Sequence, residues 1–174
     1  MLEHDSFLGL AEVAIVLAGF SGISVVLSRR GPGALSQLDA SRIATLVESS
    51  LAVALFALLP LALSGLGARG SVLWTICSGS LAIYLASLSI RVAISTSRLY
   101  RDEPSERDRP VWVVVSFGGA LVAVVMQCLN VFAVGFDRTS GPYVFGIVLC
   151  LALNSRLFVR SLSILRSPLP DARK

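Results

Sequence analysis

Histidine and cysteine are scarce in this chain, and their scarcity argues against several classes of enzyme. The 174 residues include one histidine, His4, and three cysteines. Cys77, Cys128 and Cys150 all lie inside long apolar runs, where a free thiol usually packs as a small hydrophobic side chain. A metal site needs several ligands at close spacing, and the sequence has no such set. It has no P-loop or haem-ligand pair either, so we expect neither a metal nor a cofactor.

Charge is also scarce. Charged residues make up 15% of the chain, against about 25% in an average soluble domain. Hydrophobic residues make up 55%, and the mean hydropathy is +0.78. The long apolar runs have no polar face wide enough for a helix in water. These properties exclude an ordinary soluble protein, and we expect the lipid bilayer to be the solvent of this chain.

Five stretches are long and apolar enough to cross a bilayer, since about 20 helical residues span about 30 Å of hydrocarbon. They are Phe7–Leu27, Ile43–Leu66, Val72–Ile94, Val111–Phe136 and Pro142–Leu162. The sequence therefore predicts an all-α fold, a polytopic membrane helix bundle with five transmembrane helices. We expect one domain over residues 1–166 and a short cytoplasmic tail over 167–174.

The distribution of basic residues predicts the orientation of the bundle. Three segments on one side carry most of them: Arg29, Arg30, Arg42, Arg98, Arg101, Arg107, Arg109, Arg166, Arg173 and Lys174. The other side has only Arg69 and Arg138. Because basic loops stay in the cytoplasm, we expect the N-terminus outside and the C-terminus inside a bacterial inner (plasma) membrane. The acidic start predicts a first span that is not cleaved. Basic helix ends suit lipid headgroups, so no nucleic-acid partner is expected.

Two carboxylates lie inside the predicted spans, where a charge needs a partner or a task. Glu12 lies about 7.5 Å below the outer end of the first span, at a rise of about 1.5 Å per residue. Glu48 lies at a similar depth from the inner end of the second span. These depths predict two polar layers. The outer layer would unite Glu12 with Thr75, Ser78, Gln127 and Asn130, and the inner layer would unite Glu48 with Thr45, Arg91, Asn154 and Arg156.

The two layers support two interpretations that the sequence leaves open. In the first, polar pairs only specify helix packing: Glu48 neutralises Arg91 or Arg156, and a protonated Glu12 bonds to Gln127 or Asn130. In the second, Glu12 and Glu48 form an ion or proton path that Gln127 and Asn130 assist. Depth alone does not decide between them, because the rotation of each helix about its axis is unknown.

Small residues in the first span predict the close approach of another helix. Ala14, Ala18 and Gly22 recur every four residues and form a narrow ridge. The approaching helix can belong to the same bundle or to another copy. If several copies gathered around this span, Glu12 would form a carboxylate ring of the sort that selects cations. We expect a homo-oligomer or a complex with a membrane partner subunit.

One short motif is similar to that of a membrane protease. Gly19-Phe-Ser21-Gly22 resembles the G-x-S-G of rhomboid intramembrane proteases. In that family a histidine from another transmembrane helix activates the serine. His4 lies about 25 Å from Ser21 along a continuous helix, and a serine without a base is not a nucleophile. Protease activity is therefore not expected.

A second motif is similar to that of a glutathione-using family. Arg42-Ile-Ala-Thr45-Leu-Val-Glu48 resembles the second-helix signature of the membrane-associated eicosanoid and glutathione metabolism proteins, with Thr45 where that family has asparagine. The resemblance implies a trimeric helix bundle that uses glutathione, with Arg42 and Glu48 helping to bind it.

The sequence thus predicts a small multipass integral membrane protein, with an oligomeric ion or proton conduit as its first candidate function. A non-catalytic membrane scaffold or accessory subunit is the alternative. A membrane-bound glutathione-using enzyme is a more remote one, and the composition favours a role without catalysis.

Overall fold

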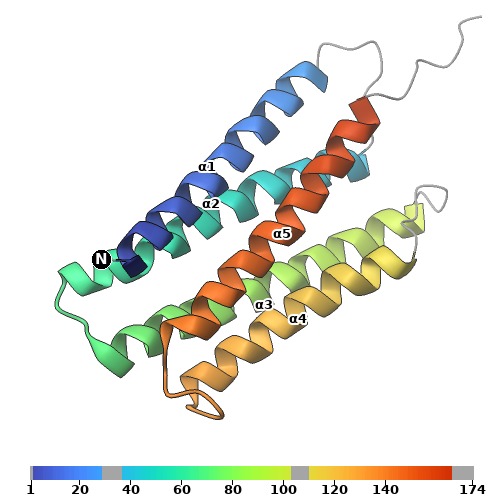
Figure 1. Cartoon of the computed structure of the whole chain (residues 1–174). Helices are drawn as coiled ribbons and strands as arrows, with labels where there is room; N and C mark the ends of the chain where they lie inside the picture. The colour runs from blue at the N-terminus through green and yellow to red at the C-terminus, as the bar shows by residue number, and fades with distance from the viewer. Residues whose placement is uncertain (1, 29–36, 103–109, 166–174) are drawn as a thin grey trace, which may run out of the picture.

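Five α-helices make up the part of the chain that the structure describes (Figure 1). The computed structural model describes residues 2–28, 37–102 and 110–165. The helices are α1 (Leu2–Ser28), α2 (Gln37–Gly65), α3 (Gly70–Asp102), α4 (Pro110–Val131) and α5 (Ser140–Leu165). We call the end at which α2 begins and α3 ends the inner end, after the predicted orientation, and the opposite end the outer end. The prediction of an all-helical fold is confirmed for the described residues.

Within the described ranges, four helices are long and apolar enough to cross a membrane. The stretches are Ile43–Gly65, Gly70–Arg98, Val113–Val131 and Ser140–Val159. They belong to α2, α3, α4 and α5 and are compatible with a membrane protein. α1 is helical over the whole first predicted span, but its crossing and the orientation of the bundle stay predictions. The predicted tail, residues 167–174, lies outside the described residues.

The fourth helix is shorter than the sequence predicted, because α4 ends at Val131 and not at Phe136. Side chains on both sides of the turn account for this end. Asn130 accepts a hydrogen bond from the backbone N–H of Thr139 at 3.1 Å and donates one to the Thr139 carbonyl at 3.0 Å. Arg138 donates from Nε to the carbonyl of Val131 at 3.2 Å. The apolar composition of residues 132–136 therefore misled the prediction, since polar bonds end the helix there.

α1 packs against α2 and α5 with one buried face, made of one phenylalanine and three alanines. Phe7, Ala11, Ala14 and Ala18 recur every three or four residues and are at most 8% exposed. The predicted ridge thus lies inside the bundle at Ala14 and Ala18. Gly22 is half-buried, and a Cβ there would meet no atom within 4 Å. Close packing in this ridge therefore stops before Gly22.

Aromatic rings from three helices fill the outer end of the bundle. The ring centroids of Phe7 on α1, Trp74 on α3 and Tyr143 on α5 lie 6.0 to 6.3 Å apart in each pair. The Tyr143 hydroxyl donates to the carbonyl of Phe56 on α2 at 2.6 Å. Four helices are therefore tied together at this level, and Tyr143 is fully buried.

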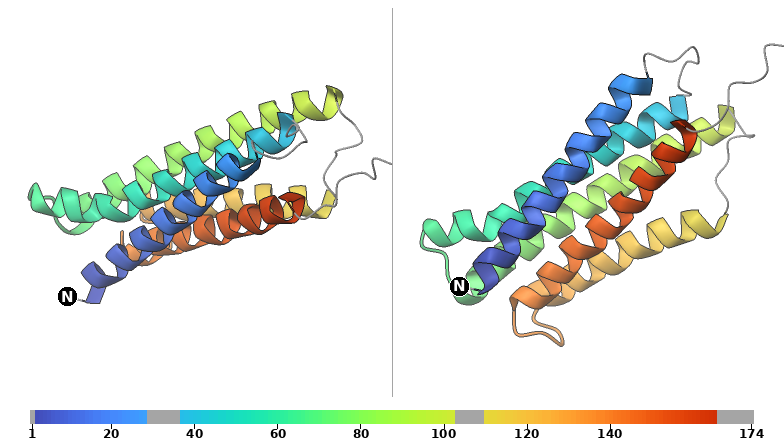
Figure 2. Two further views of the ribbon diagram at one scale, coloured as in Figure 1. Left: turned by 90° about the horizontal axis from the view of Figure 1, so that it is seen from above. Right: turned by 45° about the horizontal axis from the view of Figure 1, so that its top comes forward.

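The helices separate toward the inner end. Figure 1 shows α5 close to α4 at the end where the chain passes from one to the other, and far from α4 at the opposite end. The right-hand view in Figure 2 shows the same separation. Side chains in the inner half of the bundle line two hollows, and these side chains define the candidate site.

Candidate functional site

A cavity of about 190 Å³ lies between α2, α3, α4 and α5 in the inner half of the bundle. Its walls are mostly apolar and include Val53, Leu85, Leu88, Phe117 and Leu153. A smaller number of polar side chains line the same space: Thr45, Ser49, Tyr84, Ser89, Thr96, Ser116, Asn154 and Arg156. Mostly apolar walls with a few polar groups are the usual form of a small-molecule site.

A second hollow, of about 210 Å³, continues from the cavity toward the inner end. The linings of the two spaces share Thr45, Leu88, Val92, Thr96 and Leu157. The second hollow is also lined by Glu48 and Arg91. A charged pair therefore stands beside the entrance to an apolar space.

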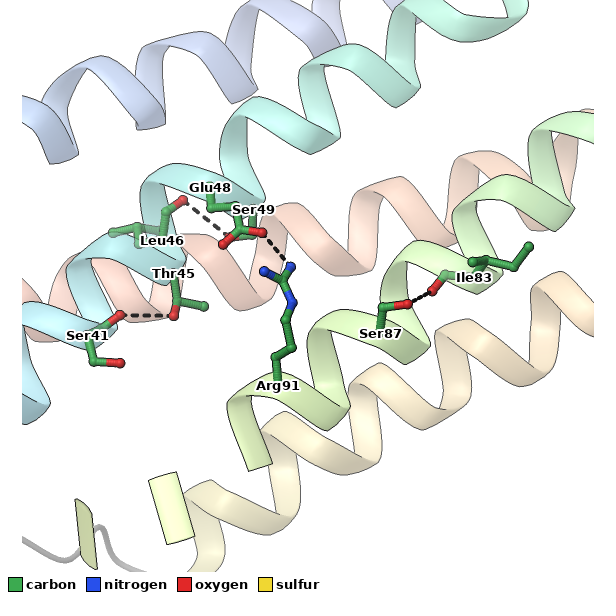
Figure 3. A network of polar contacts seen from close by, with 8 residues as sticks. All are labelled: Ser41, Thr45, Leu46, Glu48, Ser49, Ile83, Ser87 and Arg91. Atoms are coloured by element: carbon green, nitrogen blue, oxygen red, sulfur yellow. Dashed lines mark hydrogen bonds and ion pairs between the residues drawn. The ribbon is translucent and has the colours of Figure 1, made fainter. Parts of the chain in front are cut away.

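Glu48 and Arg91 form an ion pair between α2 and α3. Figure 3 shows Arg91 extending from α3 toward the carboxylate of Glu48, to which its guanidinium donates. The Glu48 side chain is 47% exposed and that of Arg91 57%, so a molecule in the hollow can reach both. The sequence offered two partners for Glu48, and the structure brings Arg91 to it. Arg156 donates from Nη1 to the Ser116 hydroxyl of α4 at 2.7 Å.

Asn154 is buried and joins α5 to α2. Its Oδ1 accepts a hydrogen bond from Ser49 at 2.8 Å, and its Nδ2 donates to Ser50 at 3.3 Å. Thr45 donates to the Ser41 carbonyl of its own helix at 2.9 Å. The five residues of the predicted inner layer line one or both hollows: Thr45, Glu48, Arg91, Asn154 and Arg156.

Tyr84 belongs to the cavity wall, although the sequence analysis did not select it. Its ring packs on Phe56 at a centroid distance of 5.3 Å. Its hydroxyl is buried and has no hydrogen-bond partner among the described residues. A usable signal was present in the sequence: tyrosine in membrane helices is enriched at the two interfaces, and Tyr84 stands near the middle of α3.

Gln127 and Asn130 of the predicted outer layer are both fully buried on α4. Gln127 donates from Nε2 to the Pro142 carbonyl of α5 at 2.7 Å. Asn130 donates from Nδ2 to the Ser78 hydroxyl of α3 at 2.8 Å. These bonds tie α4 to both neighbouring helices, so in one copy of the chain both side chains take part in helix packing.

Glu12 lies on the outward face of α1, apart from the rest of the predicted outer layer. Its side chain is exposed, and it forms no hydrogen bond or ion pair with another residue of the described ranges. The same face carries exposed apolar side chains, including Leu8, Val16 and Ile23. The structure therefore brings Glu12 neither to the buried Gln127 and Asn130 nor to Glu48.

No group of three or more histidine, cysteine, aspartate or glutamate side chains that could hold a metal occurs among the described residues. Comparison with known proteins finds no relative, since no family model, no curated protein and no solved structure matches the chain. The resemblance of residues 42–48 to a glutathione-using family thus rests on those residues alone. In that motif Glu48 pairs with Arg91, and the Arg42 side chain lies outside the described ones.

Proposed function

We propose that this protein is a membrane-embedded binding protein that takes a small, mostly apolar molecule into the inner half of its helix bundle. The observation that supports this is the apolar cavity of about 190 Å³, with its few polar groups and its charged entrance. An apolar cavity of about 150 Å³ holds a benzene molecule. The cavity therefore suits a molecule of one or two rings, or a short chain, with a polar group.

The geometry favours ligand binding over the ion or proton conduit that the sequence suggested. A path from Glu12 to Glu48 would have to pass the outer half of the bundle. There Gln127 and Asn130 are fully buried and hydrogen-bonded to α5 and α3. Glu12 faces away from the bundle, and no residue of the predicted outer polar layer lines either hollow.

Saturable binding of a fluorinated probe tests the proposal. We expect 4-fluoroacetophenone, a one-ring ketone, to show a saturable broadening of its ¹⁹F NMR line with the purified protein in micelles. The Ala120→Leu variant adds three carbon atoms to the cavity wall. It should weaken binding roughly tenfold or more, because the added atoms occupy the space that the probe needs.

A matched control distinguishes binding of the probe in the cavity from its uptake by the detergent micelle. Ala152→Leu adds the same atoms to an exposed position of α5 and should leave binding unchanged. Circular dichroism of both variants checks that the helices remain. Broadening that does not saturate, or that is equal in the two variants, would contradict a site in the cavity.

A second candidate function, assembly with other membrane subunits, is favoured by Glu12. A carboxylate on an outward apolar face is costly in lipid unless another group covers it. Open space surrounds a Cβ built at Gly9 or Gly19 of the same helix, so another helix could approach closely there. A second copy of this chain is the partner we propose for that face.

Disulfide cross-linking in membranes tests this assembly. Val16→Cys on α1 should form a cross-linked dimer under mild oxidation, and Val125→Cys on α4, similarly exposed, should not. Adding Gly19→Leu to Val16→Cys should reduce cross-linking at least fivefold, because leucine fills the open space. Equal cross-linking at the two cysteine positions would argue against a contact through α1.

A further inference from the structure

The cavity and the second hollow adjoin, but they differ in chemistry. The walls of the cavity are mostly apolar, and the lining of the hollow includes the ion pair of Glu48 and Arg91. Along α2 the cavity is lined between Thr45 and Val53 and the hollow between Ser41 and Glu48, so the hollow lies nearer the inner end. A single molecule can therefore place an apolar part in the cavity and a polar part in the hollow.

The ion pair has hydrogen-bonding capacity left for such a polar part. A guanidinium carries five N–H donors and a carboxylate two acceptor oxygens. Arg91 donates from Nη2 to Oε1 of Glu48 (Figure 3), and among the described residues neither side chain makes a further hydrogen bond. Both side chains are about half exposed and both line the hollow. The ion pair thus offers donors and acceptors side by side.

The charges of the ion pair limit the charge of its ligand. An anionic group would meet the carboxylate of Glu48 at short range, and a cationic group would meet the guanidinium of Arg91. Beside an apolar cavity such like-charge contacts are costly, because little water screens them. A neutral group that both donates and accepts avoids both repulsions. A carboxamide is such a group, since its oxygen accepts from a guanidinium and its NH₂ donates to a carboxylate.

We propose that Glu48 and Arg91 together bind the polar head of the ligand, and that the ligand is an amphiphile whose neutral head, such as a carboxamide, both donates and accepts hydrogen bonds. This inference rests on the proposed function and adds the chemical class and the orientation of the ligand. The apolar part points toward the middle of the bundle and the head toward its inner end. An amphiphile in one leaflet of a bilayer has the same orientation, with its head at the headgroups.

Four probes of the same shape test the choice of head group. They are 3-(4-fluorophenyl)propanamide, the methyl ketone 4-(4-fluorophenyl)butan-2-one, the anion 3-(4-fluorophenyl)propanoate and the cation 3-(4-fluorophenyl)propanamidine. In ¹⁹F NMR titrations of the wild-type protein in micelles at neutral pH, the amide should bind more tightly than the other three. We expect roughly three- to tenfold over the ketone, the ratio of one net hydrogen bond, because the ketone has no N–H to donate.

Removing either charge should change the preference in opposite directions. In Glu48→Gln the affinity for the anion should rise roughly fivefold or more relative to the amide, because Arg91 then forms a charge-assisted bond without a competing carboxylate. In Arg91→Gln the cation should gain by a similar factor, because Glu48 is left without its partner. Comparing probes within each variant cancels the uptake of the probes by the micelle.

Arg98→Gln is the matched control, because Arg98 is an exposed arginine of the same helix that lines neither hollow. It should keep the wild-type order of the four probes. An ion pair that is half exposed adds little to stability, so Glu48→Gln and Arg91→Gln should remain folded. Circular dichroism and saturable binding of the ketone by each variant check this.

The outcomes separate this inference from the proposal on which it depends. If Ala120→Leu weakens the binding of all four probes but neither charge variant changes their order, the cavity binds ligands and the role of the ion pair is overturned. If Arg98→Gln favours the cation as much as Arg91→Gln does, the effect reflects the charge of the whole bundle and the role is again overturned. If no probe binds the wild type in a saturable manner, the proposed function itself fails.

Discussion

The Gly146→Ala variant is expected to be less stable than the wild type by about 1–3 kcal/mol. A Cβ at Gly146 would overlap the side-chain amide of Gln127, at a separation that real Cβ atoms do not show. Gln127 is fully buried and cannot move aside without losing its bond to the Pro142 carbonyl. The steric overlap and the loss of this hydrogen bond both follow from one added methyl group. Thermal unfolding in micelles, followed by circular dichroism, measures the loss.

Gly79→Ala is the control for this prediction. A Cβ at Gly79 would make only an ordinary contact, 3.8 Å from a methyl carbon of Val131. Because alanine is the better helix former, this variant should be as stable as the wild type or slightly more so. Adding Gln127→Ala to Gly146→Ala removes the overlap, so the double variant should lose less than the sum of the two single losses. If Gly146→Ala and Gly79→Ala unfold at the same temperature, the Gln127 side chain does not pack against Gly146.

Hydropathy predicted the helices well because lipid restricts the choice of structure. A chain that crosses hydrocarbon must satisfy its backbone internally, so long apolar runs of this kind are helical. The predicted spans of α2, α3 and α5 accordingly agree closely with the apolar stretches of the structure. Hydropathy failed at the end of α4, where the side chains of Asn130 and Arg138 end the helix although the next residues are apolar.

The depth of a residue within its span predicted its level along the bundle, but not the side of the bundle that its side chain faces. Gln127 and Asn130 are three residues apart and share the buried face of α4, as the helical period requires. Glu12 was expected at their level, and it lies on a different side of the molecule. The buried ridge of Ala14 and Ala18 turns Glu12 outward, since a helix advances about 100° per residue. A pattern within one helix shows which residues share a face, and only packing shows what that face meets.

The cavity itself could not be predicted from the sequence. It is lined by residues of α2, α3, α4 and α5, in the half of the bundle toward which α5 and α4 diverge (Figure 1). That divergence is a property of the whole packing, and no single helix encodes it. Tyr84 shows the consequence: its position within α3 was clear from the chain, but the isolation of its hydroxyl depends on all the helices around it.

The Asn130→Leu variant is expected to lose about 2–3 kcal/mol of stability, because three hydrogen bonds disappear together. Asn130 donates to Ser78 on α3 and both donates to and accepts from the backbone of Thr139, which leads into α5. Leucine keeps the branched shape of asparagine but is bulkier, so the loss combines the polar groups left without partners with some overpacking. Ser78→Ala removes only one of the three bonds and should cost roughly 1 kcal/mol or less.

Hydrogen exchange tests whether the Asn130 side chain holds the turn between α4 and α5. In Asn130→Leu the backbone amides of residues 132–139 should exchange at least tenfold faster than in the wild type, because the N–H of Thr139 loses its acceptor and the turn opens more often. In Ser78→Ala the same amides should stay protected, since Thr139 keeps both of its bonds. Equal protection in the two variants would mean that Arg138 and the backbone hydrogen bonds of the turn hold it without the Asn130 side chain.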